Sequence, residues 1–470
     1  MAWANRRAGM ALRNGGRSAH HAPMIPRTRR IDVVGFANVL GCVLLVAALI
    51  ALPQSSEAAA TSWTQKLDRY IRGFEQNGDF RGNIRVSRGG RALLAKSYGL
   101  ASSTFVVSHS ASSKFLIASV TKTFTAAAIV LLQADGRLSI EDELSKFLPD
   151  FPRANEIKIK HLLLHSSGLQ NPDYPSIAAR AVTPRELLQM IASKPLLFKP
   201  GSESRYSNAG YIVLASVVEE AAGQRFCDYL ASRIFRPLGM RNTGCLASGQ
   251  VVPKLAEGYV PGEGTESLRA PFQDPSSFFG SGNLYSTAED LDVWLQAIDE
   301  KRLFDVAKLS YPFGWGKRRW YDREVLVQSG FEIGYSCIIL TVPAERLHLI
   351  VLMNTQSGVT ADEGKAMLGF AYGIDAPPPP KRAAVATIPE ETLSKYAGTY
   401  LYPEGGFPMH IELADAKLWL RWADSTERAF LTPVGPAEFL DRRSFGRLAF
   451  EQNQAVWIQD SKRLVCPKQP

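Results

Sequence analysis

The sequence lacks the patterns that mark several common kinds of site. It has only five cysteines in 470 residues, and none of them has the spacing of a zinc site. It has no Gly-x-Ser-x-Gly motif, which argues against an α/β-hydrolase nucleophile. No internal repeat is evident, so a repeat architecture is not indicated. What remains is a chain with 46% hydrophobic residues, long enough for more than one globular unit.

A basic surface for nucleic acid is also lacking, although the net charge is +9. Residues 1–60 contain seven arginines and two acidic residues, a net charge of +5. The rest of the chain therefore carries only +4, which is ordinary for its size. We expect no nucleic-acid partner.

Residues 1–60 have the pattern of an export signal or membrane anchor. A basic stretch at residues 27–30 precedes an apolar run at residues 33–52, and three alanines follow at residues 58–60. The run is long for a cleaved signal, so an uncleaved anchor stays open, whereas Cys42 lies too early in it for a lipid-attachment site. We expect the protein to be periplasmic or anchored to the outer face of the inner membrane.

The pattern of the remaining chain predicts an α+β fold. Residues 84–99 read as a hairpin around a glycine turn, and helical patterns dominate residues 121–238. Strand patterns return at residues 324–327, 335–341 and 347–353. Strands at both ends with helices between them indicate one antiparallel sheet flanked by helices, plus an all-helical lobe.

Four consecutive prolines at residues 377–380 predict an extended linker over residues 375–386. After it, alternating segments at residues 409–413, 417–422 and 429–432 read as short antiparallel strands. We therefore expect a large domain at residues 61–374 and a small β-barrel-like domain at residues 387–470. Trp419 and Trp422 are interpreted as core of this small domain rather than as a sugar platform.

The most informative motif is Ser119-Val-Thr-Lys122, at the head of an apolar helical run. The spacing puts a hydroxyl and an amine one turn apart on the same helical face. A serine needs a neighbouring base to become a nucleophile, and a lysine can serve if burial lowers its pKa. The alternative is a purely structural role, in which the serine caps the helix and the lysine is solvated.

A second cue is Tyr206-Ser-Asn208, between a Pro-Gly loop and a helix expected to begin near Ala209. A tyrosine there could reach a cleft, and its phenolate could act as a base if nearby lysines hold its pKa down. The Asn208 amide can donate to a substrate carbonyl and accept from a lysine.

A third cue is Gln328-Ser329-Gly330-Phe331, placed directly after a predicted strand. A small, flexible backbone beside a nucleophile lets peptide N–H groups point at a developing oxyanion.

These three motifs, in this order, resemble the serine β-lactamase and penicillin-binding protein superfamily, in particular its class C-like branch. The resemblance covers about residues 66–372, and the tail is similar to the lipocalin-like domains of some members. It implies that Ser119 is acylated, that Lys122 and Tyr206 share the proton transfers, and that Asn208 orients the substrate. The N–H groups of Ser119 and Phe331 would form the oxyanion hole, with no cofactor and no metal.

Gln328 departs from the family pattern, which usually has Lys or His there. A glutamine keeps hydrogen bonds but offers no charge to a substrate carboxylate. Uncharged esters or amides therefore fit better than D-Ala-D-Ala peptides and β-lactams, unless Lys317, Arg318, Arg319 or Arg323 restores the charge. The expected partner is a small-molecule ester, amide or short peptide substrate. The favoured function is an esterase or amidase. The alternatives are a D-amino-acid peptidase, DD-carboxypeptidase or weak β-lactamase, and a non-catalytic penicillin-binding-like sensor.

Two further side-chain groups have structural interpretations. His161 and His165 are spaced i, i+4, but only leucines separate them, so packing is favoured over a metal site. Cys337 lies in an apolar strand pattern and reads as a buried thiol. Disulfide pairing among the other cysteines, and the oligomeric state, stay open.

Overall fold

The computed structural model describes residues 52–263, 266–304, 314–358, 361–379, 388–404, 406–423, 428–459 and 462–470. The chain separates into residues 1–57 and residues 58–470, and the description below concerns the second unit. Residues 1–51 of the predicted export segment at residues 1–60, and residues 380–386 of the predicted linker, lie outside the described residues. No helix in the described part is long and apolar enough to cross a membrane.

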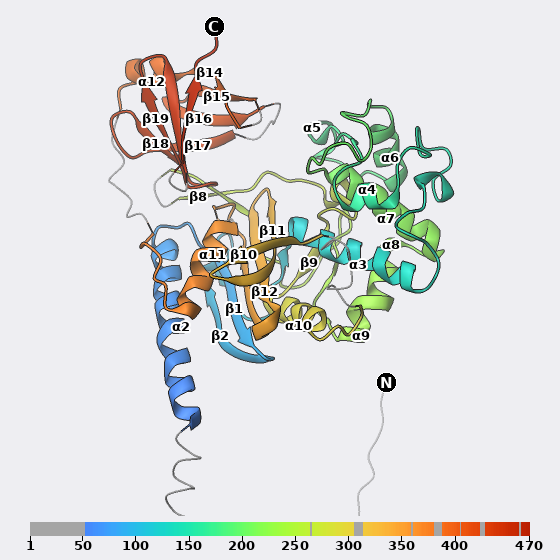
Figure 1. Ribbon diagram of the computed structural model, residues 1–470. Coiled ribbons are helices and arrows are strands. Elements are labelled where there is room, and N and C mark those ends of the chain that lie inside the picture. Colours follow the sequence, from blue (N-terminus) through green and yellow to red (C-terminus); the bar gives the residue numbers. More distant parts are fainter. Residues whose placement is uncertain are drawn as a thin grey trace, which may run out of the picture. The chain divides into compact units, whose positions relative to one another are not determined.

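A six-stranded antiparallel sheet forms the centre of the larger domain (Figure 1), in the order β10-β11-β12-β13-β1-β2. Its strands are β10 (Gly316–Trp320), β11 (Arg323–Glu332), β12 (Tyr335–Val342), β13 (Leu347–Met353), β1 (Gly82–Arg88) and β2 (Arg91–Tyr98). β1 pairs with β13, so strands from the two ends of this domain join in one sheet. The sequence prediction of such a sheet is confirmed.

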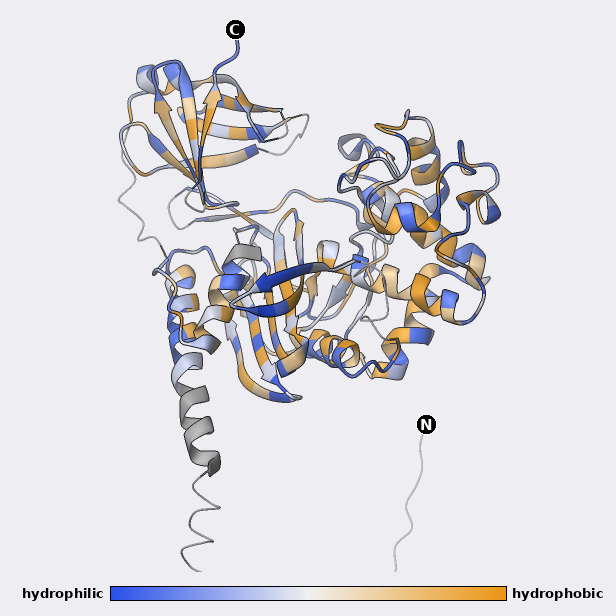
Figure 2. Ribbon diagram, viewed as in Figure 1, coloured by the Kyte–Doolittle hydropathy of each residue, from blue (hydrophilic) through white to orange (hydrophobic). Residues whose placement is uncertain are grey.

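β12 and β13 are buried along their whole length because helices cover both faces of the sheet. On one face, Ile339 and Ile350 pack with Trp294 of α10 (Ala288–Asp299) and with the helical lobe. On the other, Ile338 and Val351 pack with α2 (Leu52–Gln76) and α11 (Ala361–Gly369). Figure 2 shows this pattern as orange central strands, whereas the edge strand β10 is blue.

The helical lobe is inserted between β5 (Phe115–Leu116) and β9 (Leu284–Ser286), two strands of a small sheet that also contains β6 (Gly244–Cys245). Its helices are α3 (Thr121–Ala134), α4 (Ile159–Leu163), α5 (Tyr174–Ile177), α6 (Pro184–Ala192), α7 (Asn208–Ala222), α8 (Phe226–Leu230) and α9 (Arg236–Leu238). α3 and α7 are almost fully buried and form its core. A disulfide joins Cys227 of α8 to Cys245 of β6.

Two further pairs of short strands lie at the edge of the larger domain: β3 (Leu100–Ser102) with β4 (Val107–Ser108), and β7 (Tyr259–Pro261) with β8 (Ser267–Arg269).

After α12 (Glu390–Tyr396), eight antiparallel strands form a nearly closed barrel with its own core. They are β14 (Gly398–Tyr402), β15 (Phe407–Ala414), β16 (Lys417–Trp422), β17 (Arg428–Pro433), β18 (Glu438–Asp441), β19 (Gly446–Glu451), β20 (Gln454–Gln459) and β21 (Lys462–Pro467). A bridge between Tyr400 and Lys468 joins the first strand to the last. The predicted all-β tail is confirmed.

The barrel is held against the larger domain through the β18–β19 turn. Arg442, which is 1% exposed, donates from Nε to Asp79 Oδ1 at 2.7 Å. It also donates to the carbonyl oxygens of Gly78 and Gly262, both at 3.0 Å. Phe445 stacks on Phe74 of α2 with ring centroids 5.5 Å apart. A buried guanidinium satisfied in this way fixes the orientation of the barrel.

Candidate active site

Ser119 lies in a single 3-10 turn (η2, Ala118–Val120) between β5 and the first residue of α3. Ala118 has φ = +43°, an unusual value for a residue with a side chain. Such strained backbone is characteristic of functional turns.

Lys122 is buried in the first turn of α3, 1% exposed. Its Nζ donates to Ser119 Oγ at 2.9 Å and to the carbonyl oxygen of Ser281 at 2.8 Å. Burial lowers the pKa of Lys122 to about 7, although Glu332 partly opposes the shift. About half of the molecules therefore carry a neutral amine at pH 7, which is the form that can accept a proton.

The Tyr206 hydroxyl donates to Ser119 Oγ at 2.7 Å, and the Lys122 ammonium lies 5.0 Å from the tyrosine ring centroid. Burial raises the pKa of Tyr206, and the hydrogen bond with Ser119 only partly offsets this. The direction is opposite to the one that a phenolate base requires. Tyr206 is therefore a neutral hydroxyl, and Lys122 is the better base of the two.

Asn208 begins α7, one residue before the expected start of that helix. The Lys122 hydrogen bonds go to Ser119 and Ser281, and among the described residues none joins Lys122 to Asn208. The Asn208 amide instead lies beside Tyr174, whose pKa is raised by burial and partly lowered by that amide. The structure thus places Asn208 beside Tyr174 at the start of α7 and does not show the expected contact with the lysine.

The Gln328–Phe331 motif lies within β11 and not after it, because β11 continues to Glu332. The predicted strand end at Val327 was wrong. Gln328 Nε2 donates to the carbonyl oxygen of Ser119 at 3.2 Å. Ser329 pairs with Ile338 across the sheet, and Phe331 is 51% exposed.

At Gly330, β11 lies close to the turn that holds Ser119. A Cβ at this position would lie 2.4 Å from the carbonyl oxygen of Ile117 and 3.1 Å from Ser119 N. Only a glycine leaves room for this approach. It brings the strand backbone alongside the Ser119 N–H, as an oxyanion site requires.

The basic residues upstream of Gln328 have other partners. Lys317 pairs with Glu324 at 2.6 Å, and Arg323 pairs with Glu345 at 2.5 Å. Arg319 lies 3.6 Å from Asp322, and Arg318 donates to the carbonyl oxygen of Lys317. These contacts give no support to the idea that this group restores a cation at Gln328.

His165 and Asn171 support the site, and the sequence interpretation assigned neither of them a place there. The ring of His165 packs at a tilt against the rings of Tyr206 and Tyr211, with centroid distances of 4.6 Å and 5.1 Å. Burial lowers the pKa of His165 to about 4, so the imidazole is neutral and accepts from Ser207 N at 3.1 Å. Asn171 Oδ1 accepts from the backbone N–H groups of Asn208 and Ala209, and so caps α7.

Both histidines of the i, i+4 pair have partners within the protein. His161 Nδ1 accepts from Lys158 N, and His165 accepts from Ser207 N. Cys337 is a buried free thiol on β12, as predicted, and contacts the carbonyl oxygen of Ile117. Within the described part of the chain, no cluster of His, Cys, Asp or Glu could hold a metal ion.

A family model described as Beta-lactamase matches residues 67–373. The chain belongs to this family.

Relatives and solved structures agree with this assignment. The chain is 28% identical over 365 residues to penicillin-binding protein 4* of Bacillus subtilis, covering 69% of this chain and 80% of that protein. It is 28% identical over 267 residues to the teichoic acid D-alanine hydrolase of Staphylococcus aureus, covering 55% of this chain and only 63% of that protein.

Two solved structures share the fold. A D-amino acid amidase from Ochrobactrum anthropi, solved with D-phenylalanine, aligns with a TM-score of 0.59 at 21% identity, over 66% of this chain and 99% of the amidase. An octameric penicillin-binding protein homologue from Pyrococcus abyssi aligns with a TM-score of 0.56 at 22% identity, over 86% of this chain and 99% of that one. By its match to the family model, the protein belongs to a family of hydrolytic enzymes.

In this beta-lactamase family member, a cleft of about 730 Å³ opens beside Tyr206. Asn171, Lys194, Arg205 and Tyr206 line it from the helical lobe, and Trp422 and Ala423 line it from the barrel. A second cleft of about 600 Å³ shares Gln273 and Ile333 with the first. The first cleft reaches Ser119 through Tyr206, which lines the cleft and donates its hydroxyl proton to Ser119 Oγ.

Proposed function

We propose that this protein hydrolyses ester or amide bonds through an acyl-enzyme on Ser119. The observation that carries the proposal is the arrangement around Ser119 Oγ, which has two hydrogen-bond partners, one of them a lysine with a lowered pKa. Lys122 Nζ lies 2.9 Å away and the Tyr206 hydroxyl 2.7 Å away, while burial lowers the lysine pKa to about 7. A hydroxyl between a neutral amine and a neutral phenol has both a proton acceptor and a proton donor within reach.

In acylation, neutral Lys122 takes the Ser119 proton as Oγ attacks the substrate carbonyl carbon. The resulting oxyanion faces the N–H groups of Ser119 and Phe331, each worth about 3 kcal/mol of barrier. Collapse of the intermediate breaks the bond to the leaving group. Tyr206 passes its proton to the leaving oxygen or nitrogen and regains one from Lys122.

In deacylation, water attacks the acyl-enzyme and gives its proton to Lys122 through Tyr206. The second intermediate then releases the acid, and the proton returns from Lys122 to Ser119 Oγ. The enzyme returns to its starting state with one water consumed. No cofactor is required in this sequence.

The substrate class that we propose is a small ester, amide or short peptide. Asn208 at the start of α7 would orient it. Gln328 donates to the Ser119 backbone and carries no charge, so a carboxylate near this strand has no cationic partner there. This favours an esterase or amidase over a DD-carboxypeptidase or β-lactamase, and a non-catalytic sensor would require that deacylation fails.

We also propose that the protein acts outside the cytoplasm. The disulfide between Cys227 and Cys245 supports this, because such bonds persist mainly in oxidising compartments.

The deciding experiment is hydrolysis of an uncharged p-nitrophenyl ester by residues 61–470, with Ser119→Ala as control. We expect turnover that disappears in the mutant, together with a covalent acyl adduct on Ser119 by mass spectrometry. Turnover that persists in Ser119→Ala would refute the assignment. A stable adduct without turnover would favour the sensor.

A further inference from the structure

The cleft beside Tyr206 has walls from two domains. Trp422 ends β16 and Phe407 begins β15, and the backbone N–H of Ala423 donates to the carbonyl oxygen of Pro408 at 2.7 Å. These residues therefore lie together at one end of the barrel. The ring of Trp422 also makes edge-to-face contacts with the rings of Trp457 and Tyr402, with centroid distances of 5.3 Å and 5.1 Å. Part of its ring belongs to the barrel core, as predicted, but the residue also lines the cleft.

The barrel also contacts a cation beside the nucleophile. The guanidinium carbon of Arg205 lies 5.5 Å from the centroid of the Phe407 ring, a cation–π distance. Arg205 N donates to the carbonyl oxygen of His165 at 2.8 Å, and His165 stacks on Tyr206. Arg205 thus contacts the catalytic tyrosine indirectly, through its backbone hydrogen bond to His165, and contacts the barrel directly through its side chain.

The described lining of this cleft is positively charged. Lys194 and Arg205 face it, against the single carboxylate of Asp173. Lys194 donates to the carbonyl oxygen of Asn171, and no carboxylate in the described part of the chain pairs with Arg205. A planar guanidinium next to a cleft suits a carboxylate or another anionic oxygen group.

We infer that the barrel completes the substrate site, with Phe407 holding Arg205 as the residue that binds an anionic group of the substrate. The inference rests on the proposed function and narrows its substrate class to esters or amides that carry such a group. The anion is expected on the barrel side of Ser119 and not at Gln328. Trp422 forms the wall that keeps this group next to the guanidinium.

The test compares matched substrates with and without a carboxylate. One pair varies the acyl group, p-nitrophenyl butyrate against p-nitrophenyl hemisuccinate. The other varies the leaving group, phenyl butyrate against 3-carboxyphenyl butyrate. In at least one pair, Arg205→Gln should lower the ratio of kcat/KM for the charged over the neutral substrate about tenfold.

Further variants separate charge from position. Arg205→Lys should keep part of the preference, since it keeps the charge but not the planar group. Phe407→Ala, on the barrel, should lower the same ratio at least threefold. Arg428→Gln is the matched control, because Arg428 is likewise an exposed arginine over an aromatic ring, 4.5 Å from the Trp419 ring centroid, but it lies in the barrel and does not line the cleft.

An unchanged ratio in both Arg205→Gln and Phe407→Ala, for both pairs, would overturn the inference and leave the proposed function standing. Absence of turnover on all four substrates would instead count against the proposed function. In that case, NMR titration still decides the inference. The affinities for 3-hydroxybenzoate and for phenol are measured in the wild type and in Arg205→Gln, and the variant should lose affinity for 3-hydroxybenzoate alone. Equal affinities in the two proteins would overturn it.

Discussion

In the proposed mechanism, proton transfer depends on the ionisation of one buried lysine. Because burial lowers the pKa of Lys122 to about 7, the amine is protonated and inactive as a base below that pH. We expect kcat/KM for an uncharged ester to fall about tenfold per pH unit below about 7 and to level off above it. The pH–rate profile of the wild type measures this.

The same pH–rate profile should be measured for Tyr206→Phe. This variant should lose about 10²–10⁴ in kcat/KM, because the hydroxyl that passes protons between Lys122 and the substrate is gone. The fall in rate at acidic pH (the acid limb of the profile) should stay near the same pH. An acid limb that disappears in Tyr206→Phe would instead identify the tyrosine as the titrating base.

Gln328 stands where the resemblance to the family leads us to expect Lys or His. Replacing it with lysine adds a cation on β11, close to the backbone of Ser119. We expect Gln328→Lys to raise kcat/KM for carboxylate-bearing substrates several-fold and to move the acid limb of the pH profile below 7, because a second cation lowers the pKa of Lys122. Gln328→Asn, which adds no charge, should do neither. No gain with lysine would contradict our account of this position.

At the scale of single residues, the sequence identifies the reacting groups better than their surroundings. Ser119 and Lys122 are one helical turn apart, so local spacing suffices to predict their contact. The hydrogen bond of Tyr206 with Ser119 and the ring contact of His165 with Tyr206 depend on segments far apart in the chain. Arg205 has no local signal at all, because its partner Phe407 lies 202 positions later.

At the scale of elements, β11 has to lie against the turn that holds Ser119. Gly330→Ala would put a Cβ 2.4 Å from Ile117 O and 2.6 Å from Cys337 Sγ. We expect a loss of about 1–3 kcal/mol in the free energy of unfolding and at least tenfold slower acylation by a fluorophosphonate probe. Gly435→Ala is the control, since its Cβ would meet nothing closer than 3.4 Å. Normal acylation in Gly330→Ala would show that the strand can move away.

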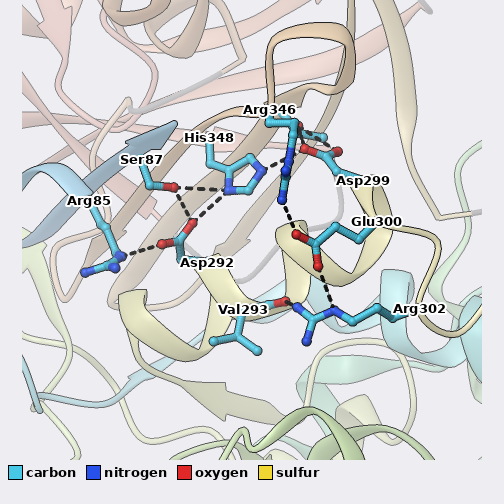
Figure 3. A network of polar contacts seen from close by, with 10 residues as sticks. Arg85, Ser87, Asp292, Val293, Asp299, Glu300, Arg302, Arg346 and His348 are labelled. Carbon is cyan, nitrogen blue, oxygen red and sulfur yellow. Dashed lines mark hydrogen bonds and ion pairs between the residues drawn. The ribbon is translucent and has the colours of Figure 1, made fainter. Parts of the chain in front are cut away.

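α10 is joined to the sheet by a buried charged network (Figure 3). His348 of β13, 1% exposed, contacts Asp292 at 2.7 Å and Asp299 at 2.8 Å, and Arg85 donates to Asp292 at 2.7 Å. Burial opposes protonation of His348, but the two aspartates outweigh it and raise its pKa above 6.5. The imidazolium therefore stabilises the fold fully below about pH 6.5, and this contribution is lost as the pH rises through the folded pKa.

His348→Gln should consequently cost about 3–5 kcal/mol in the free energy of unfolding at pH 6, and less at pH 9. Urea denaturation at both pH values measures the difference. His410→Gln, in the barrel, is the control and should change little at either pH. A deficit in His348→Gln that grows with pH would contradict a protonated His348.

Element types could be predicted from hydrophobic periodicity, but one strand end and the network could not. The pattern of β11 weakens at Gln328 and Gly330, where polar and small residues serve the site, so the predicted strand stopped too early. The ion pairs of His348 connect β13 to a helix that precedes it by about 50 residues, and no local pattern shows them.

At the scale of the whole molecule, the barrel is attached through one buried arginine. Arg442→Met would remove its hydrogen bonds to Asp79 and to the carbonyl oxygens of Gly78 and Gly262. Since Asp79 is only 4% exposed, the change leaves its carboxylate without this cation in a buried place. We expect a loss of about 3–5 kcal/mol in the free energy of unfolding, measured by urea denaturation of residues 61–470.

The same substitution tests whether the barrel acts as a fixed wall of the cleft. If Arg442 fixes the position of the barrel against the larger domain, then Arg442→Met should also weaken the contact of Phe407 with Arg205. The preference for anionic substrates should then decrease. Arg463→Met is the matched control, because that barrel arginine forms an exposed ion pair with Glu451, worth about 0–1 kcal/mol. A stable Arg442→Met protein with unchanged substrate preference would mean that the barrel keeps its place through apolar contacts such as Phe445 with Phe74.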